Sequence, residues 1–368
     1  MNKKSSKIDF LFLITLGLLV GFGLIALYSA STVKSFENFG STTYYITHQM
    51  LYGLVPGVLG FLVFSKIDYH IWQKFLSYIL FLAFILLLAV KIPGVGFSAN
   101  GAERWVHLGP IFFQPSEFAK LAIIIYLASY ANKFSLKTLN FFSGVLPPVI
   151  LVLVFAWLIL MQPDFGTMSI LVLTSAIMLL VSGLRLKHFI ILGLCGLVLS
   201  LVLIKFEPYR YNRLLSFLNS NHDKLGASYQ INQSLLGIGA GKTWGYGYGL
   251  SRQKYNYLPE PMNDSIFAIT AEELGFFRTI AMLGVFLVFI FRGIRIAKTA
   301  KDKLGQLLTV GIITWIGLQT IINISALTGL MPLTGVPLPF FSYGSSALVV
   351  LLTACGIVAN ISKQRTQI

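Results

Sequence analysis

The chain has 368 residues, of which 56% are hydrophobic and only 11% charged, and its mean hydropathy is +0.78. This composition excludes an ordinary soluble domain and predicts a membrane protein. The formal net charge of +15 does not indicate a nucleic-acid partner, because the basic residues are scattered in ones and twos at the ends of apolar runs.

The apolar residues fall into runs of about 20, the length that a helix needs to cross a hydrocarbon core of about 30 Å. The sequence therefore predicts an all-α polytopic membrane protein with about ten transmembrane helices. The predicted spans are 9–31, 44–64, 71–91, 115–132, 143–162, 165–184, 187–206, 266–292, 304–328 and 342–362. A re-entrant pair within 143–184 is an alternative, because almost no loop separates its two runs. Residues 1–368 are interpreted as a single transmembrane domain, since no segment separates a second folded unit.

The distribution of basic residues predicts that both termini face the cytoplasm, because cytoplasmic loops are enriched in Lys and Arg. The segments on that side contain Lys3, Lys4, Lys7, Lys66, Lys74, Lys133, Lys137, Arg185, Lys187, Arg292, Arg295, Lys298, Lys301, Lys303, Lys363 and Arg365. The short outer loops hold only Lys34, Lys91 and Arg104. A large extracytoplasmic loop, at about 207–265, lies between predicted helices 7 and 8. Its charges do not affect the orientation, since long loops translocate largely regardless of charge.

The first polar cluster lies at the outer end of the third predicted span and the start of the fourth. Pro115 is typical of a first helical turn. Glu117 and Lys120 are three residues apart on that helix and could neutralise each other, which would make the cluster a helix start with an internal ion pair. The functional alternative rests on Arg104 and Trp105, because a guanidinium can hold a diphosphate and an indole can lie at headgroup level.

The second cluster is the turn Gln162-Pro163-Asp164, which joins the fifth and sixth predicted spans. Asp164 directly precedes an apolar run and is typical of an ordinary helix N-cap. The same helix N-terminus could also bind an anion.

The third cluster is the long loop. It contains Arg210 and Arg213, followed by 229–234, whose pattern predicts an amphipathic helix near the membrane interface and includes Gln233. The glycine-rich stretch 237–249 lacks the spacing of a nucleotide-binding P-loop, so it indicates tight turns or close backbone approach to a ligand.

Asp264 closes the long loop, immediately before an apolar run that contains the pair Glu272-Glu273. A carboxylate between a polar loop and an apolar wall should have a raised pKa, partly opposed by nearby basic residues, and such a group suits a general base. The alternative is that Asp264 only caps the N-terminus of the helix that follows it.

The fourth cluster, 332–346, contains three prolines and two glycines at membrane depth and includes Ser342. Irregular backbone is tolerated there only where it is buried in protein or lines a cavity, so the segment is predicted to be re-entrant.

These clusters, in this order and at these separations, resemble the SEDS (FtsW/RodA/SpoVE) family of cell-wall polymerases over essentially the whole chain. The matching segments are 101–120, 162–167, 209–276 and 332–346, and the most specific part runs from Gln253 to Phe276. Within the family, residues 100–102 resemble the FtsW type slightly more than the elongation type. Two departures are visible: Met262 and Asn263 precede Asp264 where the family usually has other residues, and Ser342-Tyr343-Gly344-Ser345-Ser346 is one glycine short of the family pattern.

The resemblance implies a peptidoglycan glycosyltransferase that polymerises lipid II at the outer face of the bacterial cytoplasmic membrane, during cell division or elongation. By it, Asp264 falls where the family keeps its essential acidic residue, and we expect it to act as general base on the acceptor sugar hydroxyl. Residues expected to contact the diphosphate are Arg104, Lys120, Arg210 and Arg213, with Glu117 orienting Lys120. Further substrate contacts are predicted for Trp105, Asp164, Gln233, Lys254, Glu260 and Ser342.

No cofactor is required by the sequence, although a divalent cation such as Mg²⁺ or Mn²⁺ could share the work on the diphosphate. Cys195 and Cys355 lie far apart in apolar runs and predict neither a disulfide nor a metal site. The resemblance further implies undecaprenyl-diphosphate-linked glycan as a ligand, a class B penicillin-binding protein as partner, and other divisome or elongasome proteins. The alternatives from other classes are a flippase or transporter of the lipid-linked precursor, and a scaffold that uses the long loop for docking.

Overall fold

The computed structural model describes residues 7–99, 102–109, 111–134, 141–218 and 226–364. Its helices are α1 (Phe10–Phe39), α2 (Tyr44–Gln49), the π-helical η1 (Met50–Leu54), α3 (Val55–Lys66), α4 (His70–Lys74), α5 (Leu76–Ala89), α6 (Pro115–Lys133), η2 (Phe141–Val145), α7 (Leu146–Leu160), α8 (Phe165–Val181), α9 (Leu186–Phe206), α10 (Pro208–Leu218), α11 (Ala227–Ala240), α12 (Ile266–Lys298), α13 (Lys303–Leu327) and α14 (Ser345–Lys363). The strands are β1 (Gly96–Ala99), β2 (Ala102–Leu108) and β3 (Ile111–Phe113).

The helical, polytopic architecture is confirmed, and each predicted span coincides with helix in the structure. Within the described residues, 7 helical segments are long and apolar enough to cross a membrane, and α5 and α8 are shorter apolar helices. The total of about ten spans stays a prediction. The turn between α7 and α8 separates two full helices that pack side by side.

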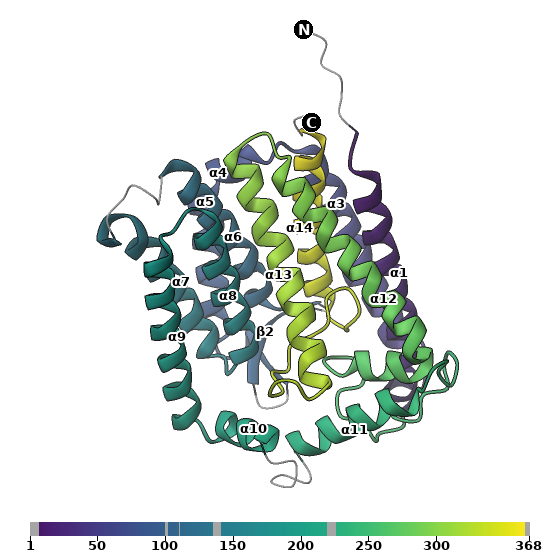
Figure 1. The fold of residues 1–368 in the computed structure, drawn as a ribbon. Coiled ribbons are helices and arrows are strands. Elements are labelled where there is room, and N and C mark those ends of the chain that lie inside the picture. Colours follow the sequence, from purple (N-terminus) through teal and green to yellow (C-terminus); the bar gives the residue numbers. More distant parts are fainter. Residues whose placement is uncertain (1–6, 100–101, 110, 135–140, 219–225, 365–368) are drawn as a thin grey trace.

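The helices at the centre of the bundle are largely buried, whereas a helix at its edge is at least partly exposed along its whole length. Helices α13 and α14 are the most enclosed, and α14 packs against α3. By contrast α9, which the structure describes in full, has no buried residue and stands at the margin of the bundle (Figure 1). Its continuous apolar surface is the kind that a helix presents to lipid.

The two ends of the bundle differ. The start of α1 and the end of α14 lie at one end, where the Asp9 amide donates to Ser362 Oγ over 3.1 Å. Helices α10 and α11 lie across the opposite end, which is called the loop end below (Figure 1). Because the chain enters and leaves the bundle at the same end, it must cross the membrane an even number of times, which agrees with the prediction that both termini lie on one side. Lys3, Lys4, Lys137 and Arg365, which supported that orientation, lie outside the described residues.

A small sheet at the start of the first polar cluster was absent from the all-α prediction. Strands β1, β2 and β3 form an antiparallel sheet in the order β1-β2-β3, with Phe97 opposite Trp105 and Val106 opposite Phe113. Because side chains alternate along a strand, Arg104 and Trp105 point to opposite faces of β2. Contact of either side chain with substrate stays a prediction.

The predicted span 266–292 is not one continuous helix. Gly275 has φ 73° and ψ −179°, a conformation essentially restricted to glycine, so 266–274 and 276–298 are two helices that meet at an angle. A Cβ on Gly275 would overlap the backbone of Gly245, which has φ 77°. At Gly245 the glycine-rich stretch therefore lies close against the backbone of Gly275, and the predicted approach of this stretch to a ligand stays a prediction.

Replacing Gly275 with alanine is expected to destabilise the protein, because the residue would need both a glycine-only conformation and space held by Gly245. The strain alone is worth about 1–3 kcal/mol, and we expect a lower midpoint of thermal unfolding in detergent. Gly284→Ala is the matched control, since it lies in the same helix and a Cβ there would meet nothing within 4 Å. Equal unfolding temperatures for the two variants would contradict the prediction.

Candidate active site

The backbone around Asp264 is clamped by the irregular segment 332–346 and by α13. The carbonyls of residues 262–264 each accept a hydrogen bond, from the Tyr343 amide over 2.8 Å, from Ser342 Oγ over 2.6 Å and from Asn323 Nδ2 over 2.7 Å, respectively. Asn323 Nδ2 also donates to the Val336 carbonyl over 2.7 Å. Segment 332–346 is thus buried in protein, and it holds the loop residues at a defined position.

Asp264 is partly exposed as a residue, and its Oδ1 is a buried oxygen without a hydrogen-bond partner among the described residues. Burial in the surrounding protein raises its pKa to about 6, and the negative charge of Glu260 also raises it. Arg213 and a hydrogen bond from Gln230 oppose that shift. A carboxylate with this pKa is ionised at neutral pH and still basic enough to accept a proton, which is what a general base requires.

Arg213 is the predicted cation that the structure places next to Asp264. A Cβ on Gly335 would lie 3.5 Å from Arg213 Nη1 and 3.8 Å from Asp264 Oδ2, so the two side chains approach the same backbone position. Arg213 Nη1 also donates to the Leu333 carbonyl over 3.0 Å. The guanidinium is therefore oriented by segment 332–346, as Asp264 is.

Three other predicted residues gather at the turn between α7 and α8. Arg104 donates to the carbonyls of Gln162 and Pro163. Asp164 accepts from the Thr167 amide over 3.0 Å and from its Oγ1 over 2.8 Å, which confirms the N-cap interpretation. The Arg210 guanidinium lies 5.6 Å from the centroid of the Phe165 ring. Two cations thus flank the N-terminus of α8, whose backbone amides favour negative charge.

The predicted ion pair of Glu117 and Lys120 is confirmed, and it is deeply buried. Lys120 Nζ lies 2.8 Å from Glu117 Oε1, and both side chains are 2% exposed. The ammonium also donates to Gln319 Oε1 over 3.1 Å and lies 4.7 Å from the Trp315 ring centroid. Gln319 in turn donates to the Pro337 carbonyl over 2.9 Å. The pair supports segment 332–346 from inside the bundle, and contact of Lys120 with a diphosphate stays a prediction.

The pair Glu272-Glu273 anchors the loop that leads to Asp264. Glu272 accepts from Ser251 Oγ and from the amides of residues 252–253. Glu273 accepts from the Ser251 amide over 3.2 Å and pairs with Lys254 at 3.4 Å. Lys254, predicted to contact substrate, is buried in this structural network. The remaining predicted residues, Gln233, Glu260 and Trp105, are partly exposed at the loop end.

Sequence reasoning missed Asn323, which donates to the Asp264 carbonyl, and Gln319, which donates to the Pro337 carbonyl in segment 332–346. The sequence does contain a signal for these two residues. They are polar side chains four residues apart in the apolar run 304–328, and a polar side chain inside a membrane segment requires a hydrogen-bond partner. No group of three His, Cys, Asp or Glu side chains in the described part of the chain is arranged to hold a metal ion. Participation of a divalent cation stays a prediction.

The fold and this site define a polytopic helical membrane protein with a clamped carboxylate and arginines at its loop end. The family model FTSW_RODA_SPOVE, described as "Cell cycle protein", matches residues 9–367. The chain belongs to this FtsW/RodA/SpoVE family.

The relatives match over most of their length. The chain is 41% identical to stage V sporulation protein E of Bacillus subtilis, covering 99% of each chain. It is 37% identical to a probable peptidoglycan glycosyltransferase FtsW of Trichlorobacter lovleyi, with 97% of this chain and 93% of that protein covered.

Solved structures share the fold. One described as "Structural coordination of polymerization and crosslinking by a peptidoglycan synthase complex" superposes with a TM-score of 0.80 at 25% identity, over 98% of this chain and 99% of that one. The crystal structure of the Thermus thermophilus rod shape determining protein RodA superposes with a TM-score of 0.72 at 24% identity, over 98% of both chains.

Proposed function

We propose that this protein is a peptidoglycan glycosyltransferase that polymerises lipid II into glycan strands. The observation that carries the proposal is Asp264, a partly exposed residue whose carboxylate has a pKa raised to about 6. Hydrogen bonds to the carbonyls of residues 262–264 fix its backbone, and its carboxylate faces Arg213. The names of the relatives, which include peptidoglycan glycosyltransferases, support the same reaction.

Lengthening a glycan from a lipid-diphosphate donor needs two things of the protein: a base for the acceptor hydroxyl and positive charge for the departing diphosphate. Asp264 takes the proton from the acceptor hydroxyl as its oxygen attacks the anomeric carbon, and the bond to the diphosphate breaks, with inversion. Arg213 is the cation nearest to this step. Arg104 and Arg210, with the N-terminus of α8, offer a second positive region for the diphosphate.

The proposal places the loop end outside and both termini in the cytoplasm of a bacterial cell, with the chain in the cytoplasmic membrane. A class B penicillin-binding protein is the proposed partner, supported by the likeness to a structure described as a peptidoglycan synthase complex. Other divisome or elongasome proteins are further proposed partners. The mechanism is derived from the protein's own groups, and a Mg²⁺ or Mn²⁺ ion would add positive charge at the diphosphate.

Purified protein supplied with labelled lipid II, with and without the candidate partner, tests the proposal. Formation of polymer supports the enzyme. Translocation of lipid II in vesicles without polymer would favour the flippase, and neither activity would favour a scaffold.

The rate of polymerisation should depend on pH through Asp264. A general base acts in its ionised form, so the rate should be constant well above the pKa of about 6 and should fall as pH decreases below it. The decrease approaches tenfold per pH unit, because the ionised fraction falls by that factor. A pH–rate profile of the purified protein between pH 4.5 and 8 measures this, and a rate that stays constant down to pH 4.5 would contradict it.

A further inference from the structure

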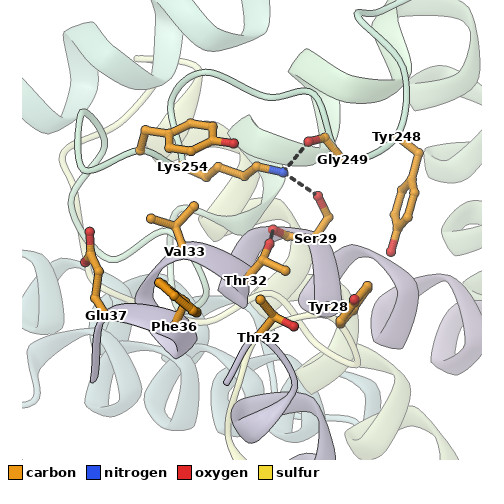
Figure 2. Close-up of a pocket in the computed structure, with 11 residues that line it drawn as sticks. Tyr28, Ser29, Thr32, Val33, Phe36, Glu37, Thr42, Tyr248, Gly249 and Lys254 are labelled. Atoms are coloured by element: carbon orange, nitrogen blue, oxygen red, sulfur yellow. Dashed lines mark hydrogen bonds between the residues drawn. The ribbon is translucent and has the colours of Figure 1, made fainter. Parts of the chain in front are cut away.

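A cavity lies away from Asp264, between α1 and the glycine-rich loop. Its volume is about 430 Å³, and its walls come from the last third of α1, Thr42 and the loop residues 248–255. Figure 2 shows side chains from these segments facing one another across the cavity. The residues assigned above to the reaction do not line it, whereas Lys254, which the sequence predicted to contact substrate, does.

The floor of the cavity is hydrogen-bonded and electrically neutralised. Lys254 Nζ donates to the Gly249 carbonyl over 2.6 Å and to Ser29 Oγ over 3.2 Å, as Figure 2 shows, and it pairs with Glu273 at 3.4 Å. Ser29 Oγ donates to Glu273 over 2.6 Å. Because the ammonium is already bonded to these acceptors, the cavity does not present a free cation, and an anionic diphosphate is a poor match for it.

The walls combine aromatic rings with hydroxyl groups and one carboxylate. Tyr248, Tyr255 and Phe36 are largely exposed aromatic side chains that line the cavity. Tyr248 is fixed, since its hydroxyl donates to the Ile25 carbonyl over 3.0 Å. The Glu37 carboxylate accepts from Asn256 Nδ2 over 2.8 Å at the rim. Rings beside such hydrogen-bonding groups suit an amphipathic, uncharged ligand whose apolar face packs on a ring while its hydroxyls bond to oxygen acceptors, as sugars do.

The cavity is tied to the reaction centre by one short helix. Segment 266–274 begins directly after Asp264 and Ser265, and it carries Glu273, which holds the cavity floor, near its other end. At 1.5 Å per residue the two positions are about 12 Å apart along the helix axis. A glycan being extended at Asp264 could therefore reach the cavity with its neighbouring sugar units.

We propose that this cavity is a saccharide subsite that holds the glycan strand beside the reaction centre. The proposal rests on the proposed glycosyltransferase function and adds a binding site for the uncharged sugar part of the polymer. Its role is to retain the strand between successive additions, so it acts on polymer length more than on the rate of the first bond.

The test compares two tyrosines that differ in position and little else. Tyr255 lines the cavity and is 59% exposed, whereas Tyr257, 57% exposed, does not line it. Binding of chitotetraose to the full-length protein in detergent is measured by isothermal titration calorimetry. Tyr255→Ala is expected to weaken this binding by about two- to tenfold, the range for loss of one stacked ring, and Tyr257→Ala should leave it unchanged.

Polymerisation gives a second measurement. With labelled lipid II, Tyr255→Ala should form shorter strands than the wild type at a similar initial rate of lipid II consumption, and Thr42→Trp, which fills the cavity, should do the same. Equal affinity and strand length in all variants would overturn the subsite, as would a wild-type protein that does not bind chitotetraose. A wild-type protein that binds chitotetraose but forms no polymer would instead overturn the proposed glycosyltransferase function.

Discussion

Replacing Asp264 with asparagine is expected to abolish most of the polymerase activity. The amide keeps the size of the side chain but cannot accept a proton, and loss of a general base lowers rates by about 10²- to 10⁴-fold. Folding should be preserved, because the hydrogen bonds that hold the backbone of residues 262–264 are accepted by carbonyl groups, which the substitution leaves unchanged. Polymer formed by the purified variant from labelled lipid II is the measurement, with thermal unfolding as the check on folding.

The matched control is Glu103→Gln, which removes the charge of an exposed carboxylate from β2, near the same end of the bundle. It should polymerise at the wild-type rate. A normally folded Asp264→Asn variant with full activity would exclude the proposed general base, and any residual activity should lose the decrease near pH 6.

The second large effect is expected inside the bundle, at Lys120. Lys120→Met leaves the Glu117 carboxylate buried without its cation, and breaking a buried pair in this way costs about 3–5 kcal/mol. The double variant Glu117→Gln, Lys120→Met removes both charges and should recover most of that stability, since no unpaired ion remains. The midpoint of thermal unfolding in detergent, compared among the wild type, single and double variants, measures the effect.

An exposed pair serves as the control for this experiment. Lys91 and Glu103 are 3.4 Å apart and 44% and 50% exposed, so Lys91→Met should change stability by less than about 1 kcal/mol. The double variant also separates two roles of Lys120. If it is stable and polymerises lipid II, the predicted contact of Lys120 with the diphosphate is excluded; if it is stable and inactive, that contact is supported.

Local signals predicted most of the helices correctly. Apolar runs placed them, Pro115 marked the start of α6, and Asp164 capped α8. The two helices separated by Gly275 were predicted as one span, because a single glycine in an apolar run is often tolerated within a helix. The small sheet at 96–113 was missed for a related reason: its strands are short, and their stability depends on pairing with one another.

In the candidate site, too, some features follow from local sequence and others from tertiary packing. The sequence by itself determined the membrane class, the polar clusters and the choice of Asp264, because composition, hydrophobic period and residue order are local properties of the chain. Only the tertiary structure decided that Arg213 lies beside Asp264 while Arg104 and Arg210 gather at the start of α8. It likewise placed Lys254 against the buried carboxylate of Glu273 in a different segment, whereas the pairing of Lys120 with Glu117 was already predicted from their spacing on one helix. The physical reason is that charged side chains in a membrane bundle pair with groups from distant helices, and such pairings depend on packing that no local pattern encodes.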